Sequence, residues 1–359
     1  MIRRRQKYII KYAALGGIAT AVADVFLQWN ELKSKGLDIT WDNFDGKRTF
    51  KRGLIGGGIG AFYGYKSYID KLDYEARFPF NGDEYLRRLL AKENITSDPM
   101  LLKTCLKYKY FLKDWLANKF NKDLAGTPED AGSFFKYTAI KSNFDFDIIL
   151  PFKRTSYLSL QDMFYNVYDT INKELDEKAF ISKQTKGIGI TFERHGSPIH
   201  FDVIPGREIS DYQMDKKLNL YVRPDWAWQK GSSFKTNVQL QKRITQNMPQ
   251  VRKAIKLIKL YRDRNGLNIP SVLIEQCVCE ALSQEMYKVS FSCMENFLNG
   301  MLHLSNRMRQ EKFVDFINTN NNLLEKMPDY DKSHISEQLR RDIAKVENNP
   351  RYLEELFDL

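Results

Sequence analysis

The chain has 359 residues, enough for two or three domains, and its 43% hydrophobic content supports a well-filled core and excludes disorder throughout. Its four cysteines form no CxxC pairs, which argues against a disulfide framework or a structural zinc site and indicates a reducing compartment. Lys and Arg number 56 against 45 Asp and Glu, so the net charge of +11 favours polyanions: nucleotides, nucleic acid or acidic lipid.

The first apolar stretch covers residues 12–29 and follows a basic cluster at residues 3–11. Within it Thr20, Asp24 and Gln28 recur every four residues, which places them on one face of a helix. The stretch is therefore predicted to be an apolar helix with one narrow polar stripe. Its 18 residues are almost enough to span a bilayer.

A second apolar stretch, over 53–69, carries Gly56, Gly60 and Gly64 at the same interval. Small residues so spaced let two helix backbones approach closely, whereas in water each glycine weakens a lone helix. We interpret residues 1–80 as a Gly-rich helical pair that docks on the body of the protein, on a second copy or on a partner. Insertion in or on a membrane is the alternative.

Residues 82–122 have apolar residues at helical spacing, and residues 127–130 mark a break. Beyond it Gly132 and Ser133 open a turn whose backbone amides and hydroxyl are suited to terminal phosphates. The aromatic and β-branched residues of 144–150 predict a strand, on which Asp145 and Asp147 face the same side.

A third acid, Asp202, lies in the middle of an apolar strand predicted over 199–205. A strand over 187–193 precedes it, with a hairpin turn at 195–198. Three carboxylates on adjacent strands are suited to two Mg²⁺ or Mn²⁺ ions, because hard oxygen ligands suit these cations; solvated edge acids are the alternative interpretation. We expect His200 on the opposite strand face and do not assign it as a ligand.

The second half of the chain is mostly helical. Val251–Tyr261 repeats apolar residues at helical spacing, and its Lys259 is suited to reaching phosphate oxygens. Trp226, Trp228 and Tyr261 have the side chains to stack a base, but we expect each of them in the core. The charge-alternating tail after Ser333 predicts an exposed helix.

These motifs resemble those of the polymerase-β-like nucleotidyltransferases, and within them the cGAS/DncV-like enzymes (CD-NTases) of bacterial anti-phage defence. The resemblance spans about residues 100–300: the Gly-Ser turn, the Asp-x-Asp strand, the third-Asp strand ending in Val-Ile-Pro, and the helical segments at 251–261 and 270–275. It implies that Lys259 and Ser271 contact the donor triphosphate. It also implies metal-dependent transfer of a nucleoside monophosphate to a hydroxyl, with release of pyrophosphate.

From this resemblance we expect an α/β (α+β) fold: an N-terminal extension over 1–80, a nucleotidyltransferase core with a mixed sheet over 81–215, and a helical domain over 216–359. The expected product is a nucleotide signal made from nucleoside triphosphates, with ATP among them. The alternative is a linear oligonucleotide, of ribo- or deoxynucleotides and primed by a protein hydroxyl, that controls an effector. Tyr330, Ser333, Ser336 and Tyr352 are candidate primers, although we expect them to be ordinary surface residues.

This chemistry requires cytoplasmic nucleotides, so we expect a cytoplasmic protein, with membrane association as the alternative. Ala21-Val22-Ala23 resembles a signal-peptide cleavage site, but we interpret it as part of a retained helix.

Overall fold

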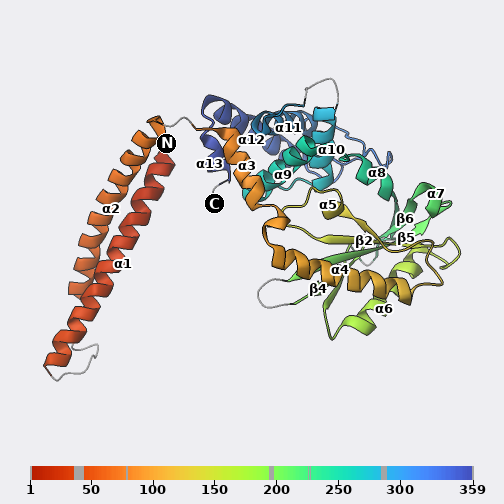
Figure 1. The fold of residues 1–359 in the computed structure, drawn as a ribbon, viewed down its shortest axis with the longest axis horizontal. Helices are drawn as coiled ribbons and strands as arrows, with labels where there is room; N and C mark the ends of the chain where they lie inside the picture. The colour runs from red at the N-terminus through yellow and green to blue at the C-terminus, as the bar shows by residue number, and fades with distance from the viewer. Residues whose placement is uncertain are drawn as a thin grey trace. The chain divides into compact units, whose positions relative to one another are not determined.

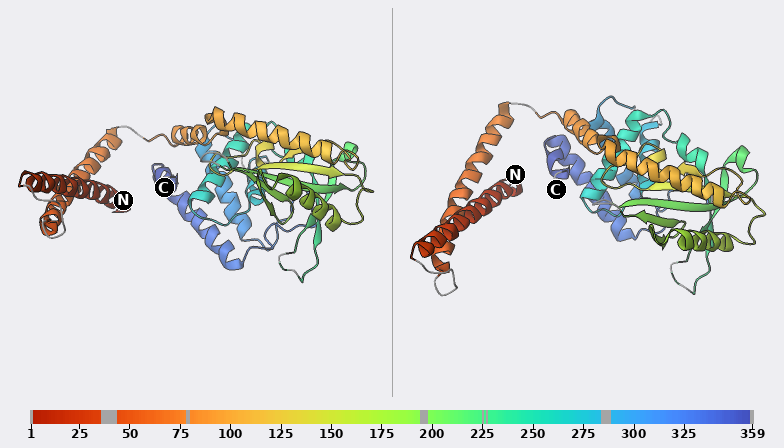
Figure 2. Two further views of the ribbon diagram at one scale, coloured as in Figure 1. Left: turned by 90° about the horizontal axis from the view of Figure 1, so that it is seen from below. Right: turned by 60° about the horizontal axis from the view of Figure 1, so that its bottom comes forward.

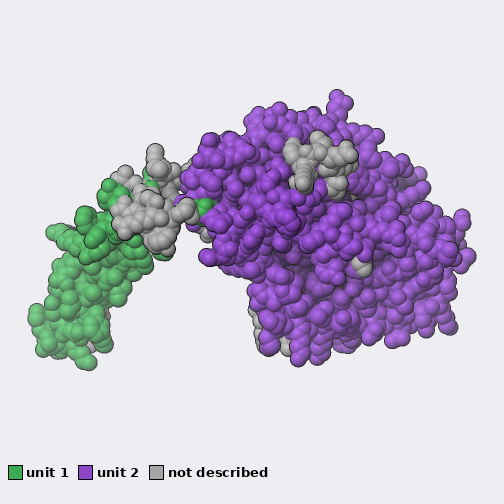
Figure 3. Space-filling view, turned by 45° about the horizontal axis from the view of Figure 1, so that its top comes forward, with its two compact units in different colours: residues 1–80 green, residues 81–359 purple. Residues whose placement is uncertain are grey.

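The structure is a computed structural model and describes residues 2–35, 44–77, 80–193, 198–224, 226, 228–283 and 289–357. Contacts divide the chain into two compact units, Met1–Phe80 and Asn81–Leu359 (Figure 3). The predicted turn at 195–198 lies mostly outside the described residues. The strands on either side of it pair antiparallel, as a hairpin requires.

The N-terminal unit is a pair of long antiparallel helices, α1 (Ile2–Ser34) and α2 (Gly46–Arg77) (Figure 1). Glycines form the contact between them: a Cβ on Gly56 would collide with Thr20 Oγ1 and the Gly16 carbonyl oxygen, and one on Gly60 with the Tyr12 carbonyl oxygen. Thr20 Oγ1 also donates to the Arg52 carbonyl oxygen across the interface, at 3.0 Å. The predicted polar stripe therefore faces α2.

A seven-stranded mixed sheet forms the centre of the second unit. Its strands run in the order β1-β2-β5-β4-β3, with β6 and then β7 added to the far end of β5. Strands β2 and β5 are parallel, and every other described pairing is antiparallel. The bounds are β1 Glu129–Ala131, β2 Phe146–Phe152, β3 Phe180–Lys183, β4 Ile188–Phe192, β5 Ile199–Glu208, β6 Lys217–Val222 and β7 Ser232–Asn237.

Helices α4 and α6 pack on one face of this sheet, and Figure 2 shows α4 along it in both views. Helices from the second half of the chain lie together beside the sheet, above it in Figure 1. The bounds are α3 Gly82–Lys92, α4 Pro99–Lys119, α5 Gly132–Phe135, α6 Leu160–Leu175, α7 Tyr212–Asp215, α8 Val238–Arg243, α9 Pro249–Arg264, α10 Ser271–Ser283, α11 Cys293–Met308, α12 Asp329–Asn348 and α13 Tyr352–Phe357, with a 3-10 turn at Ile95–Ser97.

Strand alternation decides which side chains enter the core. Phe146, Ile148 and Leu150 of β2, with their neighbours on β4 and β5, pack against α4 and α6. Because successive side chains point to opposite faces, Asp147 and Asp202 lie on the other face, with Ile149 and Ile204. The sheet thus holds two acids away from its larger core.

The helical half differs from the sequence prediction in its tail. Leu353, Leu356 and Phe357 of α13 are buried, and Phe357 packs on Phe297 of α11. The tail after Ser333 is therefore not simply an exposed helix. The boundary predicted at residue 215 stays a prediction, but the sheet extends past it through β6 and β7.

Candidate functional site

The site begins with two carboxylates on neighbouring parallel strands. Asp147 of β2 and Asp202 of β5 are register partners, so their Cα atoms lie side by side. Burial, and then the charge of Asp202, raises the pKa of Asp147 to about 7. Asp145 lies just before β2 and keeps part of its surface exposed. Its partial burial raises its pKa, the charge of His200 opposes that shift, and the charge of Asp202 adds to it. The three acids thus lie near enough for the charge of Asp202 to act on both of the others.

Gly132 explains why a Gly-Ser turn accompanies the acidic strand. Its φ of +66° lies in the left-handed region, and a Cβ there would overlap the Asp147 carboxylate. Only glycine brings the backbone this close to Asp147 without collision. Ser133 follows in α5 and lines the same pocket as Asp147.

The acids open into a pocket of about 260 Å³ between the sheet and helices α9 and α10. Six of the seven predicted site residues line it, and the seventh, Asp202, is the register partner of Asp147. These six are Gly132, Ser133, Asp145, Asp147, Lys259 and Ser271. Residues from distant parts of the sequence therefore meet in one cavity with an acidic wall and a basic wall.

Lys259 lies in the basic wall but is only 3% exposed. Its Nζ donates to Glu275 Oε1 at 2.6 Å and to Thr138 Oγ1 at 3.3 Å. Burial lowers the pKa of Lys259, and the Glu275 charge opposes that shift. Lys136 forms an ion pair with the other Glu275 oxygen. Burial alone would raise the pKa of Glu275, but the two lysines hold it at about 2.

Ser271 opens α10 and is held by an arginine of α9. Arg262 Nη1 donates to Ser271 Oγ at 2.8 Å and to the Ile269 carbonyl oxygen at 3.1 Å. Arg262 lies one turn after Lys259 on the same helix, and both line the pocket. Lys136, Arg262 and Glu275 are thus site residues that sequence reasoning missed. The three-residue spacing from Lys259 is a signal that would have found Arg262.

The expectation for His200 is wrong. Residues two apart on a strand share a face, and His200 Nε2 lies 2.8 Å from Asp202 Oδ1. Gln184 Nε2 donates to the same oxygen at 2.5 Å, and Thr191 Oγ1 lies 2.7 Å from His200 Nδ1. The hydrogen bond with Asp202 raises the pKa of His200. One oxygen of Asp202 is therefore oriented by two neighbours.

The expectation that both tryptophans lie in the core is also wrong. Trp226 and Trp228 are 58% and 79% exposed, and their rings stack on each other with centroids 5.3 Å apart. Tyr261, in contrast, is buried as expected and donates to Asp342 Oδ2 at 2.8 Å.

The donor set fits a divalent cation in its chemistry. Asp147 and Asp202 offer hard oxygen atoms side by side, and a cation between them would relieve the repulsion that raises the pKa of Asp147. Within the described ranges, no three His, Cys, Asp or Glu side chains are already gathered closely enough to hold a metal.

A second pocket, of about 220 Å³, adjoins the first. The two share Lys136, Val272 and Glu275, and the second is further lined by Phe234, Thr236 and Gln276 among others. Lys136, Val272 and Glu275 thus form a common wall between the first pocket, which is mainly polar, and the second, whose lining mixes polar and apolar residues.

No family profile and no curated protein sequence matches the chain. Solved structures do. The CD-NTase CdnG of Bradyrhizobium diazoefficiens, in complex with GTP, is 12% identical over 77% of this chain and 95% of that chain, with a TM-score of 0.61. CdnC of E. coli MS115-1 with ATP is 15% identical over 77% of this chain and 98% of that chain, with a TM-score of 0.58.

A third neighbour, the CdnE cyclic dinucleotide synthase of Elizabethkingia meningoseptica, is 14% identical over 66% of this chain and 91% of that chain, with a TM-score of 0.50. Although these identities are low, the alignments extend over almost the whole of each neighbour. The chain therefore has the fold of the cGAS/DncV-like nucleotidyltransferases, the CD-NTases.

Proposed function

We propose that this protein is a metal-dependent, template-independent nucleotidyltransferase that joins nucleoside triphosphates and releases pyrophosphate. The observation that carries the proposal is the pocket itself. Its volume is about 260 Å³, and it is lined by Asp145 and Asp147 as well as by Lys259, Arg262 and Ser271. Carboxylates for a cation and cations for phosphate are the two halves that phosphoryl transfer needs. The neighbours solved with ATP and GTP support the same substrate class.

In the proposed reaction an acceptor hydroxyl oxygen bonds to the α-phosphorus of the donor, and the bond from that phosphorus to the β-phosphate oxygen breaks. The hydroxyl proton passes to a carboxylate, for which Asp202 is our choice, and pyrophosphate leaves. Asp145, Asp147 and Asp202 would hold Mg²⁺ or Mn²⁺, which would activate the hydroxyl and neutralise charge on the phosphates. Gln184 and His200 would keep the Asp202 carboxylate oriented.

Groups from both sides of the pocket would hold the triphosphate. Ser133 and Ser271 supply hydroxyl groups and Arg262 a guanidinium at the pocket surface. Lys259 is engaged by Glu275, so its charge would act on phosphate from within the wall unless the Glu275 pair opens. Lys136, the other cation on Glu275, lines the pocket as well.

The resemblance to anti-phage CD-NTases supports a product that acts as a nucleotide signal in defence. The alternative product is a linear oligonucleotide. Of its candidate protein primers, Ser336 is buried, whereas Tyr330 is 78% exposed and Ser333 is exposed as well, so these two are the accessible hydroxyls.

The test is incubation of the full chain with all NTPs and, separately, with all dNTPs, with Mg²⁺ or Mn²⁺. Products are measured by mass spectrometry with and without phosphatase. Phosphatase-resistant species of two or three nucleotides identify a cyclic signal, whereas a linear ladder or a protein adduct identifies the alternative.

Asp147→Asn and Asp202→Asn should reduce product below detection, because each removes one of the two neighbouring carboxylates of β2 and β5. Asp176→Asn is the matched control, since Asp176 is an exposed acid at the end of α6 and outside the pocket. Full turnover by the Asp147 and Asp202 variants would contradict the mechanism, as would failure of the wild type to bind ATP or GTP in calorimetry.

A further inference from the structure

The helical pair α1–α2 has its apolar and polar sides reversed relative to a pair that folds in water. The large apolar side chains from Ile10 to Trp29 on α1 and from Phe50 to Ile69 on α2 include many that are 37–68% exposed. In a soluble helix pair such residues would form the contact between the helices. Here they point outward from both helices, and the contact is made by glycines and polar groups.

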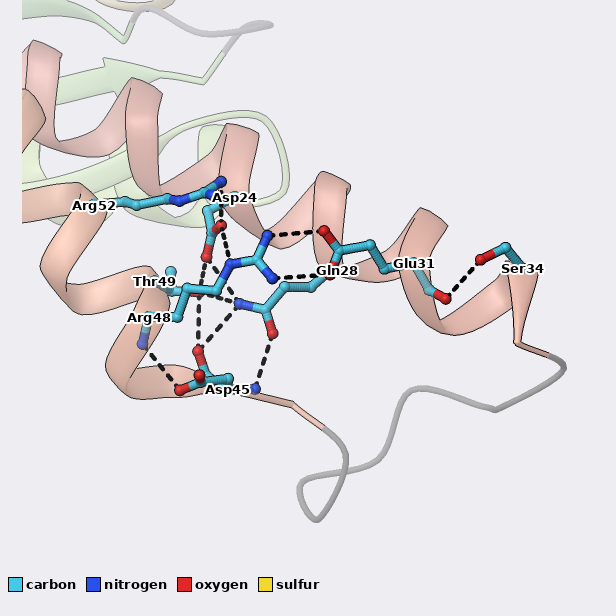
Figure 4. A network of polar contacts seen from close by, with 8 residues as sticks. All are labelled: Asp24, Gln28, Glu31, Ser34, Asp45, Arg48, Thr49 and Arg52. Carbon is cyan, nitrogen blue, oxygen red and sulfur yellow. Dashed lines mark hydrogen bonds and ion pairs between the residues drawn. The ribbon is translucent and has the colours of Figure 1, made fainter.

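The inner side of the pair holds a closed polar network (Figure 4). Asp24 is fully buried, and its carboxylate accepts hydrogen bonds from Arg48 Nε at 3.1 Å, Thr49 Oγ1 at 2.7 Å and Gln28 Nε2 at 2.8 Å. Arg52 Nη1 completes the set at 2.7 Å. Polar side chains of α1 thus form hydrogen bonds and ion pairs with polar side chains of α2.

Satisfied polar groups inside and apolar groups outside are what a lipid bilayer demands. The hydrocarbon core offers no hydrogen bonds, so charged side chains there face a helical partner and pair with it. Small residues also allow the close backbone approach by which helices associate in lipid. Gly16, Gly56 and Gly60 make that approach here.

The length and apolarity of α1 fit as well, whereas α2 does not reach the same apolarity over 18 residues. Ile9–Ser34 is apolar and long enough to cross a membrane, and its 26 residues extend about 39 Å. Only 6% of its apolar window is buried, so it is not the core helix of a soluble unit. Lysines and arginines precede the apolar part of α1 at 3–11, and in α2 they leave residues 53–65 between Arg52 and Lys66 without a charge. Such side chains can reach the lipid headgroups from the ends of a span.

We propose that α1 and α2 insert into a lipid bilayer as a membrane-spanning hairpin that anchors the nucleotidyltransferase unit. An antiparallel pair returns the chain to the side on which it begins. The basic cluster of residues 3–11 and the chain from residue 81 onward then lie on the same side. That end has eight Lys and Arg (five at 3–11, three at 66–77) against six at the loop end (33–52), so the bias of basic residues toward the cytoplasm favours it as the nucleotide-containing side.

Two alternatives to insertion in a bilayer, pairing with a second copy and removal of α1 as a signal sequence, are less consistent with the contacts. A second copy in water would cover one side of the pair, whereas exposed apolar residues lie on both helices. Removal of α1 as a signal sequence would leave Arg48 and Arg52 without Asp24. The bilayer is the occupant that covers the whole outer surface and keeps the network intact.

The first test is flotation of the full chain with vesicles of phosphatidylcholine and phosphatidylglycerol, followed by alkaline carbonate extraction. The wild type should float and resist extraction. Ile18→Lys with Val22→Lys, at outward positions 64% and 62% exposed, should reduce the vesicle-bound fraction about tenfold or more, because lysine at depth opposes insertion. Leu158→Lys with Met214→Lys, at exposed positions of the second unit, should float like the wild type.

Circular dichroism in detergent micelles shows whether the Ile18/Val22 variant keeps its helices, and equal helicity with lost flotation supports the proposal. A wild-type chain that stays monodisperse without detergent and does not float would overturn it. In that case the apolar surface is covered by a second copy or by another protein, which its mass in solution would show.

The second test separates spanning from lying on the surface. The four native cysteines are buried, so a single exposed cysteine can be introduced at Gln6→Cys or Ser34→Cys, near opposite ends of α1. With a membrane-impermeant maleimide, right-side-out and inverted membrane vesicles from expressing cells should label different positions. Equal labelling of both positions from one side would contradict the spanning hairpin.

Discussion

Two like charges are held next to each other at the centre of the site, at a cost in stability. Asp147 and Asp202 face the same side of parallel neighbouring strands, and burial together with mutual repulsion raises the pKa of Asp147 to about 7. A protein under selection for stability alone would replace one of them with an apolar residue. Such local strain is typical of sites where a cation or substrate compensates it.

Gly132 provides the sharpest single-residue prediction. Gly132→Ala should lower stability by about 1 kcal/mol through its left-handed φ and by about 1–3 kcal/mol more through collision with the Asp147 carboxylate, and product formation should fail. Gly266→Ala is the matched control, because Gly266 has a φ of +63° but nothing within 4 Å of an added Cβ. Thermal unfolding and product assays compare the two. Equal losses in both variants would contradict a specific role for the approach to Asp147.

Glu275 supports a prediction about stability and pH. Glu275→Gln leaves Lys136 and Lys259 buried without their counter-charge, so we expect a loss of about 3 kcal/mol at neutral pH. The folded pKa of Glu275 is about 2, below its ordinary 4.5. Its contribution is therefore complete above pH 4.5 and is lost as pH falls toward 2.

Melting temperatures of the wild type and Glu275→Gln, measured from neutral pH down to acid, check this prediction. The difference between the two proteins should be constant above pH 4.5 and shrink below it. The surface pair Glu84–Arg88 provides the control, and Glu84→Gln should change stability by less than about 1 kcal/mol. A difference that grows in acid would mean that Glu275 is not held ionised by the lysines.

The sequence was sufficient to predict the residues whose chemistry is unusual for their place in the chain. Acids in apolar strands and a Gly-Ser turn before them led to Gly132, Ser133, Asp145, Asp147 and Asp202, and the resemblance led to Lys259 and Ser271. Six of these seven residues line the pocket. Lys136 and Glu275 were not predicted, because their partnership joins positions 139 residues apart. Only the fold brings such groups together.

At the scale of elements, the contact between α1 and α2 depends on which glycines face it. Gly56 is buried against Gly16 and Thr20, whereas Gly58 points into open space. Gly56→Ala should separate the helices and lower the melting temperature of the pair. Gly58→Ala should stabilise α2 by about 1 kcal/mol, because alanine is the better helix former and meets no neighbour.

Circular dichroism melts of both full-length variants in the same detergent test this difference. Equal stabilisation by the two substitutions would show that the helices do not pack through Gly56. The sequence predicted the glycine spacing and the polar stripe, but not which apolar residues remain outside the contact. That division follows from the packing of two particular faces, which a one-dimensional pattern does not specify.

The strands likewise show which elements a local sequence pattern can predict and which it cannot. The predicted strands near 144–150, 187–193 and 199–205 are present with shifted ends as β2, β4 and β5, since each has a dense apolar run. The sequence analysis did not identify β1, β3, β6 or β7. The Glu129–Ala131 strand is three residues long and β7 contains mostly polar residues, so pairing with a neighbour rather than local composition defines them.

For the whole molecule, the division into units 1–80 and 81–359 predicts that anchoring and catalysis can be separated. Asp147→Asn should float with vesicles like the wild type and form no product. The Ile18→Lys/Val22→Lys variant should lose flotation and keep the turnover number of the wild type when both are assayed in detergent. The two variants would then fail in opposite assays, because each changes one unit and leaves the contacts of the other intact.

A loss of turnover in the helical-pair variant would have a specific meaning. Since the altered side chains point away from the α1–α2 contact, the loss could not come from a disrupted pair whose helicity is unchanged. It would show that the outer surface of the pair assembles an active oligomer, and light scattering of both proteins in the same detergent would then reveal different masses. Equal masses and equal turnover, with flotation lost only in the lysine variant, are the result that a membrane anchor requires.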